Sequence, residues 1–125
     1  MAYSDFTNMS VWQKAYKLAL FVYSITKTYP KEERYAIVDD MRRAALSISN
    51  NIAEGYGRFE SRDKSRFYKI SRGSAYEVLN QAILSKGLKY IDEGTFNELK
   101  LQIPQIIDEL DLLIKTLETR DAKKK

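Results

Sequence analysis

The sequence contains no cysteine and no histidine, and it has only two prolines and five glycines in 125 residues. Without cysteine the chain can form neither disulfides nor thiolate metal sites, and nothing in it points to an oxidising compartment. Without histidine it lacks the commonest general base and the commonest metal ligand. Helical-bundle metal sites combine Glu with Glu-x-x-His motifs, which this chain cannot complete. We therefore expect a protein that is not an enzyme and that uses no metal and no cofactor.

Long hydrophobic runs are also missing. The longest apolar run, residues 18–23, is far too short to span a membrane. It lies too deep in the chain, between lysines and without a small-residue cleavage site, to be a signal peptide. These features predict a soluble, cytoplasmic protein without a membrane partner. We expect one bundle domain over residues 1–122 and a disordered basic tail over residues 123–125.

Apolar residues recur at helical spacing in four segments. The strongest series, near the C-terminus, steps alternately by three and four residues, as in helices that pack at about 20°. No segment alternates with a period of two, and the short connections favour antiparallel neighbours. The sequence therefore predicts an all-α fold, an antiparallel up-down-up-down four-helix bundle. The four series are Val11, Ala15, Leu18, Val22 and Ile25; Ile37, Met41, Ala44, Ile48 and Ile52; Phe67, Ile70, Ser74, Ala75, Val78, Leu79 and Ala82; and Phe96, Leu99, Ile103, Ile106, Leu110, Leu113 and Leu117.

Capping and breaking residues predict where the first two helices begin and end. Asn8 or Ser10 is expected to cap the first helix, and the Tyr29-Pro30 pair to end it. Gly55 and Gly57 are expected to terminate the second helix in a left-handed conformation.

The other two helices have similar boundary signals. Ser61 is expected to cap the third helix, which ends near Gly87. Gly94 and Thr95 open the fourth helix. Pro104 lies inside the fourth helix, where it removes one backbone donor and is expected to produce a kink.

The first helix carries more apolar surface than one core requires. A second line, formed by Trp12, Tyr16 and Tyr23, flanks its core series, and Leu20 projects further round the helix. Isolated exposed aromatic residues are normal on any protein surface. An aromatic-rich, partly polar stripe is instead typical of a protein–protein interface. We therefore interpret Trp12, Tyr16, Leu20 and Tyr23 as the interface of a homo-oligomer.

The net charge of +4 is unevenly distributed. Residues 1–90 carry a net charge of +6, whereas residues 91–122 carry −5. A basic body with one acidic helix permits either a polyanionic partner or charge pairing between subunits.

Basic residues follow one another at helical spacing around the start of the third helix. They are Arg58, Arg62, Arg66, Lys69 and Arg72, with Phe59 and Tyr68 interleaved. One interpretation is a solvated polar face. The alternative is a nucleic-acid-binding surface for RNA or DNA, since arginine favours phosphate recognition. No base-reading motif is present, so such binding would be directed at the phosphate backbone and strongly salt-dependent.

The stretch SISNNIAEGYGR, residues 47–58, combines asparagines with a Gly-x-Gly. A phosphate-binding loop is disfavoured, because the glycines follow a helix and neither the Walker nor the dinucleotide pattern is complete. Asn51 lies on the inner side of the second helix, and a polar group there needs a partner. We interpret it as a residue that fixes helix register within or between subunits. Plausible members of its polar network are Arg43, Glu54, Arg72 and Glu77.

Several longer strings resemble a known family. They are VWQKAYKLALFVYSIT, the following YP, MRRAALSISNNIAEGYGR and RFYKISRGSAYEVLNQ. They resemble the small bacterial four helix bundle protein family, also called the 23S rRNA-intervening-sequence protein family. The resemblance covers roughly residues 5–92, and its most specific motifs are RRAA-x-SI-xx-NIAEG-x-GR and RGS-xx-E. The fourth helix is similar only in character, and Pro104 departs from the family's pattern.

The resemblance implies an antiparallel four-helix bundle that assembles as a ring-like homopentamer. A related branch, the accessory protein of diversity-generating retroelements, is a basic pentamer that binds nucleic acid and a reverse transcriptase. No catalytic role is attached to the motif residues. Two functions therefore remain open: an oligomer that binds RNA or DNA backbones, and an assembly module whose partner is another protein. The motif residues are Arg42, Arg43, Ser47, Asn51, Glu54, Gly55, Gly57, Arg58, Arg72, Gly73, Ser74 and Glu77.

Overall fold

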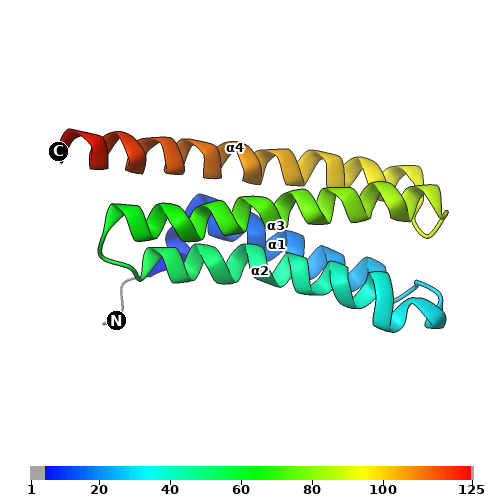
Figure 1. Ribbon diagram of the computed structural model, residues 1–125. Helices are drawn as coiled ribbons and strands as arrows, with labels where there is room; N and C mark the ends of the chain where they lie inside the picture. Colours follow the sequence, from blue (N-terminus) through cyan, green and yellow to red (C-terminus); the bar gives the residue numbers. More distant parts are fainter. Residues whose placement is uncertain (1–4, 125) are drawn as a thin grey trace.

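The computed structural model describes residues 5–124 and confirms the predicted four-helix bundle. Its helices are α1 (Ser10–Thr26), α2 (Asp39–Tyr56), α3 (Ser61–Gly87) and α4 (Glu93–Lys124). Successive helices run in opposite directions, and the described part of the chain contains no strand (Figure 1). The expected tail falls at the edge of this range: α4 continues to Lys124, and Lys125 lies outside the described residues.

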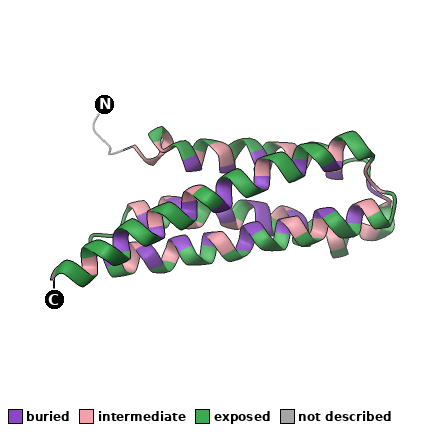
Figure 2. Ribbon diagram, turned by 90° about the horizontal axis from the view of Figure 1, so that it is seen from above, coloured by how far each residue is buried: buried purple, intermediate pink, exposed green. Residues whose placement is uncertain are grey.

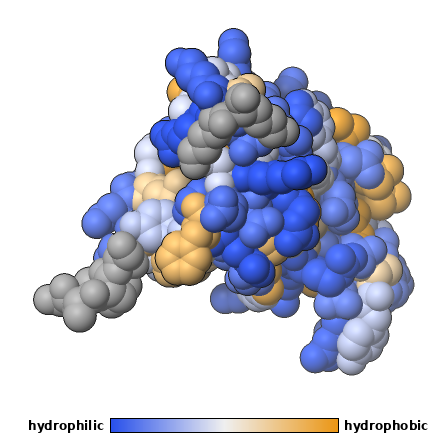
Figure 3. All heavy atoms as spheres, turned by 60° about the vertical axis from the view of Figure 1, so that its left-hand side comes forward, coloured by the Kyte–Doolittle hydropathy of each residue, from blue (hydrophilic) through white to orange (hydrophobic). Residues whose placement is uncertain are grey.

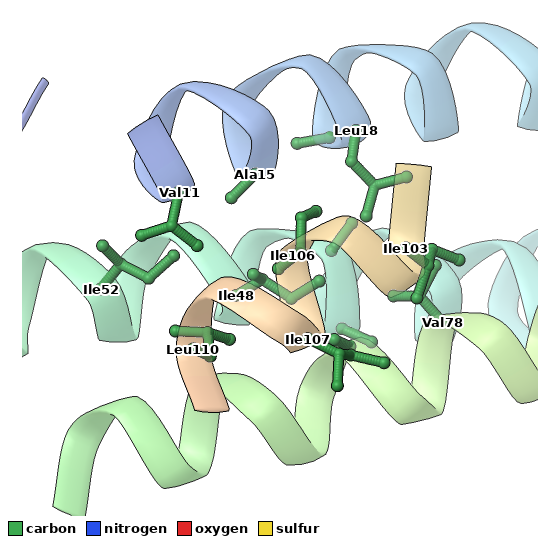
Figure 4. Packing of buried hydrophobic residues seen from close by; sticks show 14 of the residues in the cluster. Val11, Ala15, Leu18, Ile48, Ile52, Val78, Ile103, Ile106, Ile107 and Leu110 are labelled. Atoms are coloured by element: carbon green, nitrogen blue, oxygen red, sulfur yellow. The ribbon is translucent and has the colours of Figure 1, made fainter. Parts of the chain in front are cut away.

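The predicted apolar series of α1, α2 and α4 form the core, except for Ile37. Buried positions follow the inward sides of the helices (Figure 2). Leu18 points from α1 toward Ile106 of α4, beside Ile48 of α2 and Val78 of α3 (Figure 4). Each of these four side chains is fully buried. One continuous hydrophobic core therefore holds all four helices together.

The start of α1 differs from the prediction. A 3₁₀ turn at Phe6–Asn8 precedes the helix, and Asp5 caps that turn by accepting a hydrogen bond from the Thr7 amide at 2.9 Å. The N-cap position of α1 is Met9, which makes no side-chain capping bond. Neither Asn8 nor Ser10 is therefore the cap.

The start of α2 is irregular. Residues Arg34–Val38 form a π-helical turn in which Ala36 has a non-helical backbone (φ −118°, ψ −109°). The regular helix begins only at Asp39, so Ile37 lies before it. Two acidic residues, Asp39 and Asp40, occupy the first turn of α2, where they interact favourably with the helix dipole.

The prediction that glycines end α2 in a left-handed conformation is wrong. No glycine among the described residues has a positive φ, and Gly55 lies inside the helix, fully packed. Its missing Cβ leaves room for the Tyr68 ring, because a Cβ there would lie 2.7 Å from Tyr68 Cε1. Gly55 is therefore required by the close approach of α3, and its role is in packing.

The left-handed residue of the described chain is Lys89, with a φ of 64°. The Tyr90 amide donates to the Ser85 carbonyl and the Lys89 amide donates to Lys86, both at 2.9 Å, so α3 ends in a Schellman motif. The same segment connects to the opposite loop, because Tyr90 Oη donates to Glu33 Oε2 at 2.6 Å. This hydrogen bond to a carboxylate raises the pKa of Tyr90 to about 12.

The N-terminal half of α3 buries a different face from the one predicted. Ser61, Ser65, Tyr68 and Ser71 are buried, whereas Phe67 is only half-buried and Ile70 is exposed. Small serine side chains let α3 approach its neighbours closely. The buried Ser71 hydroxyl donates to the Ile48 carbonyl of α2 at 2.8 Å, which satisfies its hydrogen-bonding requirement.

The acidic fourth helix begins one residue before the predicted glycine. Asp92 accepts a hydrogen bond from the Thr95 amide at 2.8 Å, which caps the helix and lowers the pKa of Asp92. The helix continues through Pro104 without a break (Figure 1). The proline lies on the exposed side, so the helix retains its inward-facing series on both sides of it.

Candidate functional site

The asparagine-containing stretch is part of the contact between α2 and α3. Asn51 Nδ2 donates to the Ser47 carbonyl at 2.8 Å and to Ser47 Oγ at 3.0 Å. Ser47 Oγ in turn lies 2.8 Å from Ser74 Oγ of α3. The network therefore connects two helices of one subunit. The expected wider network does not form: Arg43 pairs with Asp40, Glu54 with Arg58 and Arg72 with Asp111, while Glu77 is exposed.

Arg42 connects α2 to α1. Its Nε donates to Thr26 Oγ1 at 2.8 Å, and its guanidinium lies 4.7 Å from the centre of the Tyr23 ring. Thr26 is itself buried and donates to the Val22 carbonyl at 2.7 Å. Many residues of the family motif therefore take part in contacts between the helices of one subunit. They include Arg42, Ser47, Asn51, Gly55 and Ser74.

The basic residues split into two groups, and the first surrounds Phe67. The guanidinium carbons of Arg58 and Arg66 lie 4.7 Å and 4.4 Å from the centre of the Phe67 ring. Arg58 also pairs with Glu54 at 2.9 Å. Arg62 is exposed and forms no ion pair with the residues described. Phe67 thus packs between two arginines.

The second group faces the acidic fourth helix. Lys69 pairs with Glu118, and Arg72 pairs with Asp111. The hydrogen bond to Asp111 raises the pKa of the Arg72 guanidinium. These two basic residues are therefore partly neutralised within the subunit.

Other ion pairs follow the same pattern. Lys14 of α1 pairs with Glu109, and Lys86 of α3 pairs with Glu93. Four carboxylates of the acidic helix therefore pair with basic residues of the same subunit. Exposed pairs of this kind contribute about 0–1 kcal/mol each. Tyr68, predicted to interleave with the basic residues, is buried and cannot stack on a base.

The predicted interface residues lie on the outer face of α1, on the side of α2. The Trp12 and Tyr16 rings are stacked, with centroids 5.3 Å apart. Phe6 packs edge-on against Trp12 and also contacts Tyr56 of α2. Tyr16 is 47% exposed. The aromatic cluster is therefore ordered by neighbouring rings but remains open to solvent.

The rest of this surface combines aliphatic residues with one further aromatic ring. Leu20 is 54% exposed, Tyr23 is half-buried against Arg42, and Leu46 of α2 is exposed. We call Trp12, Tyr16, Leu20 and Tyr23 the α1 face. The structure leaves all four in contact with solvent, so a single subunit does not bury them.

An apolar groove between α1, α3 and α4 was not predicted from the sequence. Phe59 was predicted only as a neighbour of the basic residues. The groove combines residues from three distant segments, which no single-segment pattern shows.

Figure 3 views the end of the bundle that contains the α2–α3 connection and shows apolar side chains in separate patches within a mainly hydrophilic surface.

Metal-binding clusters and membrane-spanning helices are both absent from the described residues. No group of three or more acidic, cysteine or histidine side chains within residues 5–124 is arranged to hold a metal ion. Over the same range, each helix is too short or too polar to traverse a lipid bilayer.

The fold and these surfaces define a small all-α protein, a four-helix bundle whose motif residues connect its own helices. The chain belongs to the 23S rRNA-intervening sequence protein family, which it matches over residues 7–111. No curated protein matches the sequence.

A solved structure has the same fold. It is a protein with unknown function from the S23 ribosomal protein family of Bacteroides thetaiotaomicron, with a TM-score of 0.78 and 21% sequence identity. The match covers 84% of this chain and 98% of the other. At this identity the similarity concerns the fold alone.

Proposed function

We propose that this protein is a non-catalytic, cytoplasmic assembly protein that associates with copies of itself through the α1 face. The observation that carries the proposal is the stack of the half-buried Trp12 on the exposed Tyr16, continued along the helix by the exposed Leu20. Aromatic residues that are ordered but open to solvent are typical of interface cores. Five is the subunit number that the family resemblance suggests.

The subunit itself favours this function over catalysis. The chain lacks cysteine and histidine, and most of its charged side chains in the structure are paired or exposed at the surface. The α1 face does not complete the core, because the inward side of α1 is already filled by Val11, Ala15, Leu18 and Val22. Burying the α1 face therefore requires another molecule.

The test is the native mass of two variants. Tyr16→Glu and Leu20→Glu each place a charge on the α1 face, and we expect the oligomer to dissociate because an unpaired charge is costly to bury. Lys17→Glu is the control, since it reverses an exposed charge on the same helix outside this face. Masses would be measured by light scattering at micromolar concentration. A monomeric wild-type protein would overturn the proposal.

Binding to a nucleic-acid backbone is the second candidate function. The observation that favours it is the cluster of exposed guanidinium groups of Arg58, Arg62 and Arg66, of which Arg58 and Arg66 lie over the Phe67 ring. Pairing of Lys69 and Arg72 with α4 reduces the predicted basic stripe to this smaller cluster. Symmetric assembly would repeat the cluster around the oligomer and strengthen a weak contact.

This candidate is tested by titrating the protein with mixed RNA and with duplex DNA at two salt concentrations. The double variant Arg62→Glu/Arg66→Glu is expected to weaken binding at least tenfold and to reduce the salt slope by about 2. The control Lys27→Glu/Lys31→Glu makes the same change of charge at exposed positions beyond α1. Binding that is absent, insensitive to salt or equally affected by the control would exclude a specific role for the cluster.

A further inference from the structure

Phe59 is the most exposed large hydrophobic residue of the described chain, at 97%. It lies in the connection between α2 and α3, next to Glu60. Glu60 is exposed and forms no ion pair within the described residues. A phenylalanine this exposed contributes almost nothing to the folding free energy of its own subunit, because almost none of its surface is removed from water.

An apolar groove lies between the first turns of α1 and α3 and the C-terminal half of α4, where α4 diverges from α1 (Figure 2). Its volume is about 490 Å³. Leu112, which is 67% exposed, forms part of its wall. The other apolar lining residues include Met9, Val11, Tyr68, Leu113 and Leu117.

On the α4 side the groove is lined by one acidic residue, Glu109, which is paired with Lys14, and by basic residues nearer the C-terminus. Arg120 lines the groove, and Lys115 and Lys123 lie with it along the adjoining surface of α4. None of these three side chains forms an ion pair with the part of the chain that the structure describes. The basic part of the rim therefore complements a free carboxylate such as that of Glu60.

We propose that the Phe59–Glu60 turn of one copy inserts into this groove on a neighbouring copy, with the Phe59 ring against Leu112 and the Glu60 carboxylate beside Arg120. This inference rests on the self-association proposed above and identifies a second, heterologous contact. An aromatic anchor in an apolar pocket, with a charge pair at the rim, is the arrangement that dominates the energy of many interfaces.

The position of the two surfaces supports an assembly of parallel subunits. The α2–α3 connection, the start of α1 and the end of α4 all lie at one end of the bundle (Figure 1). Two copies can therefore engage side by side, without a stagger along the helix axes. A heterologous contact of this kind closes into a ring when the rotation between copies permits it.

The absence of cysteine makes a cross-linking test direct. Two single variants, Phe59→Cys and Leu112→Cys, are purified separately, mixed and oxidised. We expect a disulfide-linked dimer that contains one copy of each variant, identified by giving one of them an affinity tag. The control replaces Phe59→Cys by Tyr35→Cys, another highly exposed aromatic position (84%) beyond the other end of α2. Equal cross-linking by the control would overturn the proposal.

A charge exchange gives an independent readout. Glu60→Arg and Arg120→Glu are each expected to weaken the oligomer, and the double variant is expected to restore it. If the α1-face variants dissociate the protein while Phe59→Ser and both charge variants leave its mass unchanged, this contact is wrong and the α1-face proposal stands. A monomeric wild-type protein would contradict both the Phe59–Glu60 contact and the α1-face proposal.

Discussion

Leu18→Ala is expected to lower the free energy of unfolding by about 3 kcal/mol, within the range observed for buried leucines. The Leu18 side chain is fully buried among residues from the other three helices. Its truncation removes apolar contacts and leaves a cavity that the surrounding helices cannot fill completely. Leu20, two residues later on the same helix, is 54% exposed, so Leu20→Ala should change this free energy by about 0.5 kcal/mol or less.

Urea denaturation of both variants at one protein concentration, followed by far-ultraviolet circular dichroism, measures the difference. Leu18→Met serves as a control, because a change that conserves volume should cost about 1 kcal/mol. Native mass separates the two positions in the opposite sense: Leu20→Ala should weaken assembly, whereas Leu18→Ala should affect it only through folding. Similar losses of stability at Leu18 and Leu20 would contradict the division of α1 into a core side and an interface side.

The core side and the solvent-facing side of α1 could be predicted because α1 carries two different patterns on one helix. Its core series has strict heptad spacing, and its second stripe is aromatic. The series of α4 was equally clear, since six of its seven members are buried and the seventh, Leu113, is partly buried against the core. Helix type and packing face are local properties, and such properties are visible in a single sequence.

The inward face of α3 could not be predicted in the same way. Its N-terminal half packs through Ser61, Ser65 and Ser71, which carry no hydrophobic signal. The prediction placed the larger Phe67 and Ile70 on the inward face instead. Serine becomes an inward residue only because α2 and α4 come close, and that proximity depends on the complete bundle.

The charge pairing at the surface could not be predicted from single segments either. Spacing indicated which basic residues follow one another along α3 but not which of them are paired, because the partner of Arg72 lies 39 residues further along the chain. Whether a basic stripe is free or neutralised depends on such distant carboxylates. The surface proposed for nucleic acid is therefore smaller than the predicted stripe of five residues: it keeps Arg58, Arg62 and Arg66, whereas Lys69 and Arg72 pair with α4.

Gly55→Ala is expected to destabilise the protein by about 2 kcal/mol, as overpacking of a well-filled core does. The added Cβ would lie 2.7 Å from Tyr68 Cε1 and 3.3 Å from the Lys64 carbonyl oxygen. The Tyr68 ring is buried and cannot move away freely, and the carbonyl belongs to the backbone of α3. The two helices must therefore separate slightly, which also disturbs the neighbouring hydrogen bond from Ser71 to Ile48.

Gly73→Ala is the matched control, because it makes the same change inside a helix of the same subunit. No atom lies within 4 Å of a Cβ at Gly73, so the alanine should raise stability by about 0.4–1 kcal/mol through the lower entropy of the unfolded chain. Thermal or urea unfolding of both variants measures the opposite signs. A stabilising Gly55→Ala would show that the ring of Tyr68 yields without cost, and that the glycine is not needed for the approach of α3 to α2. Loss of stability in both variants would show that an added Cβ is costly even at an open helical position, and the packing explanation would then have no support.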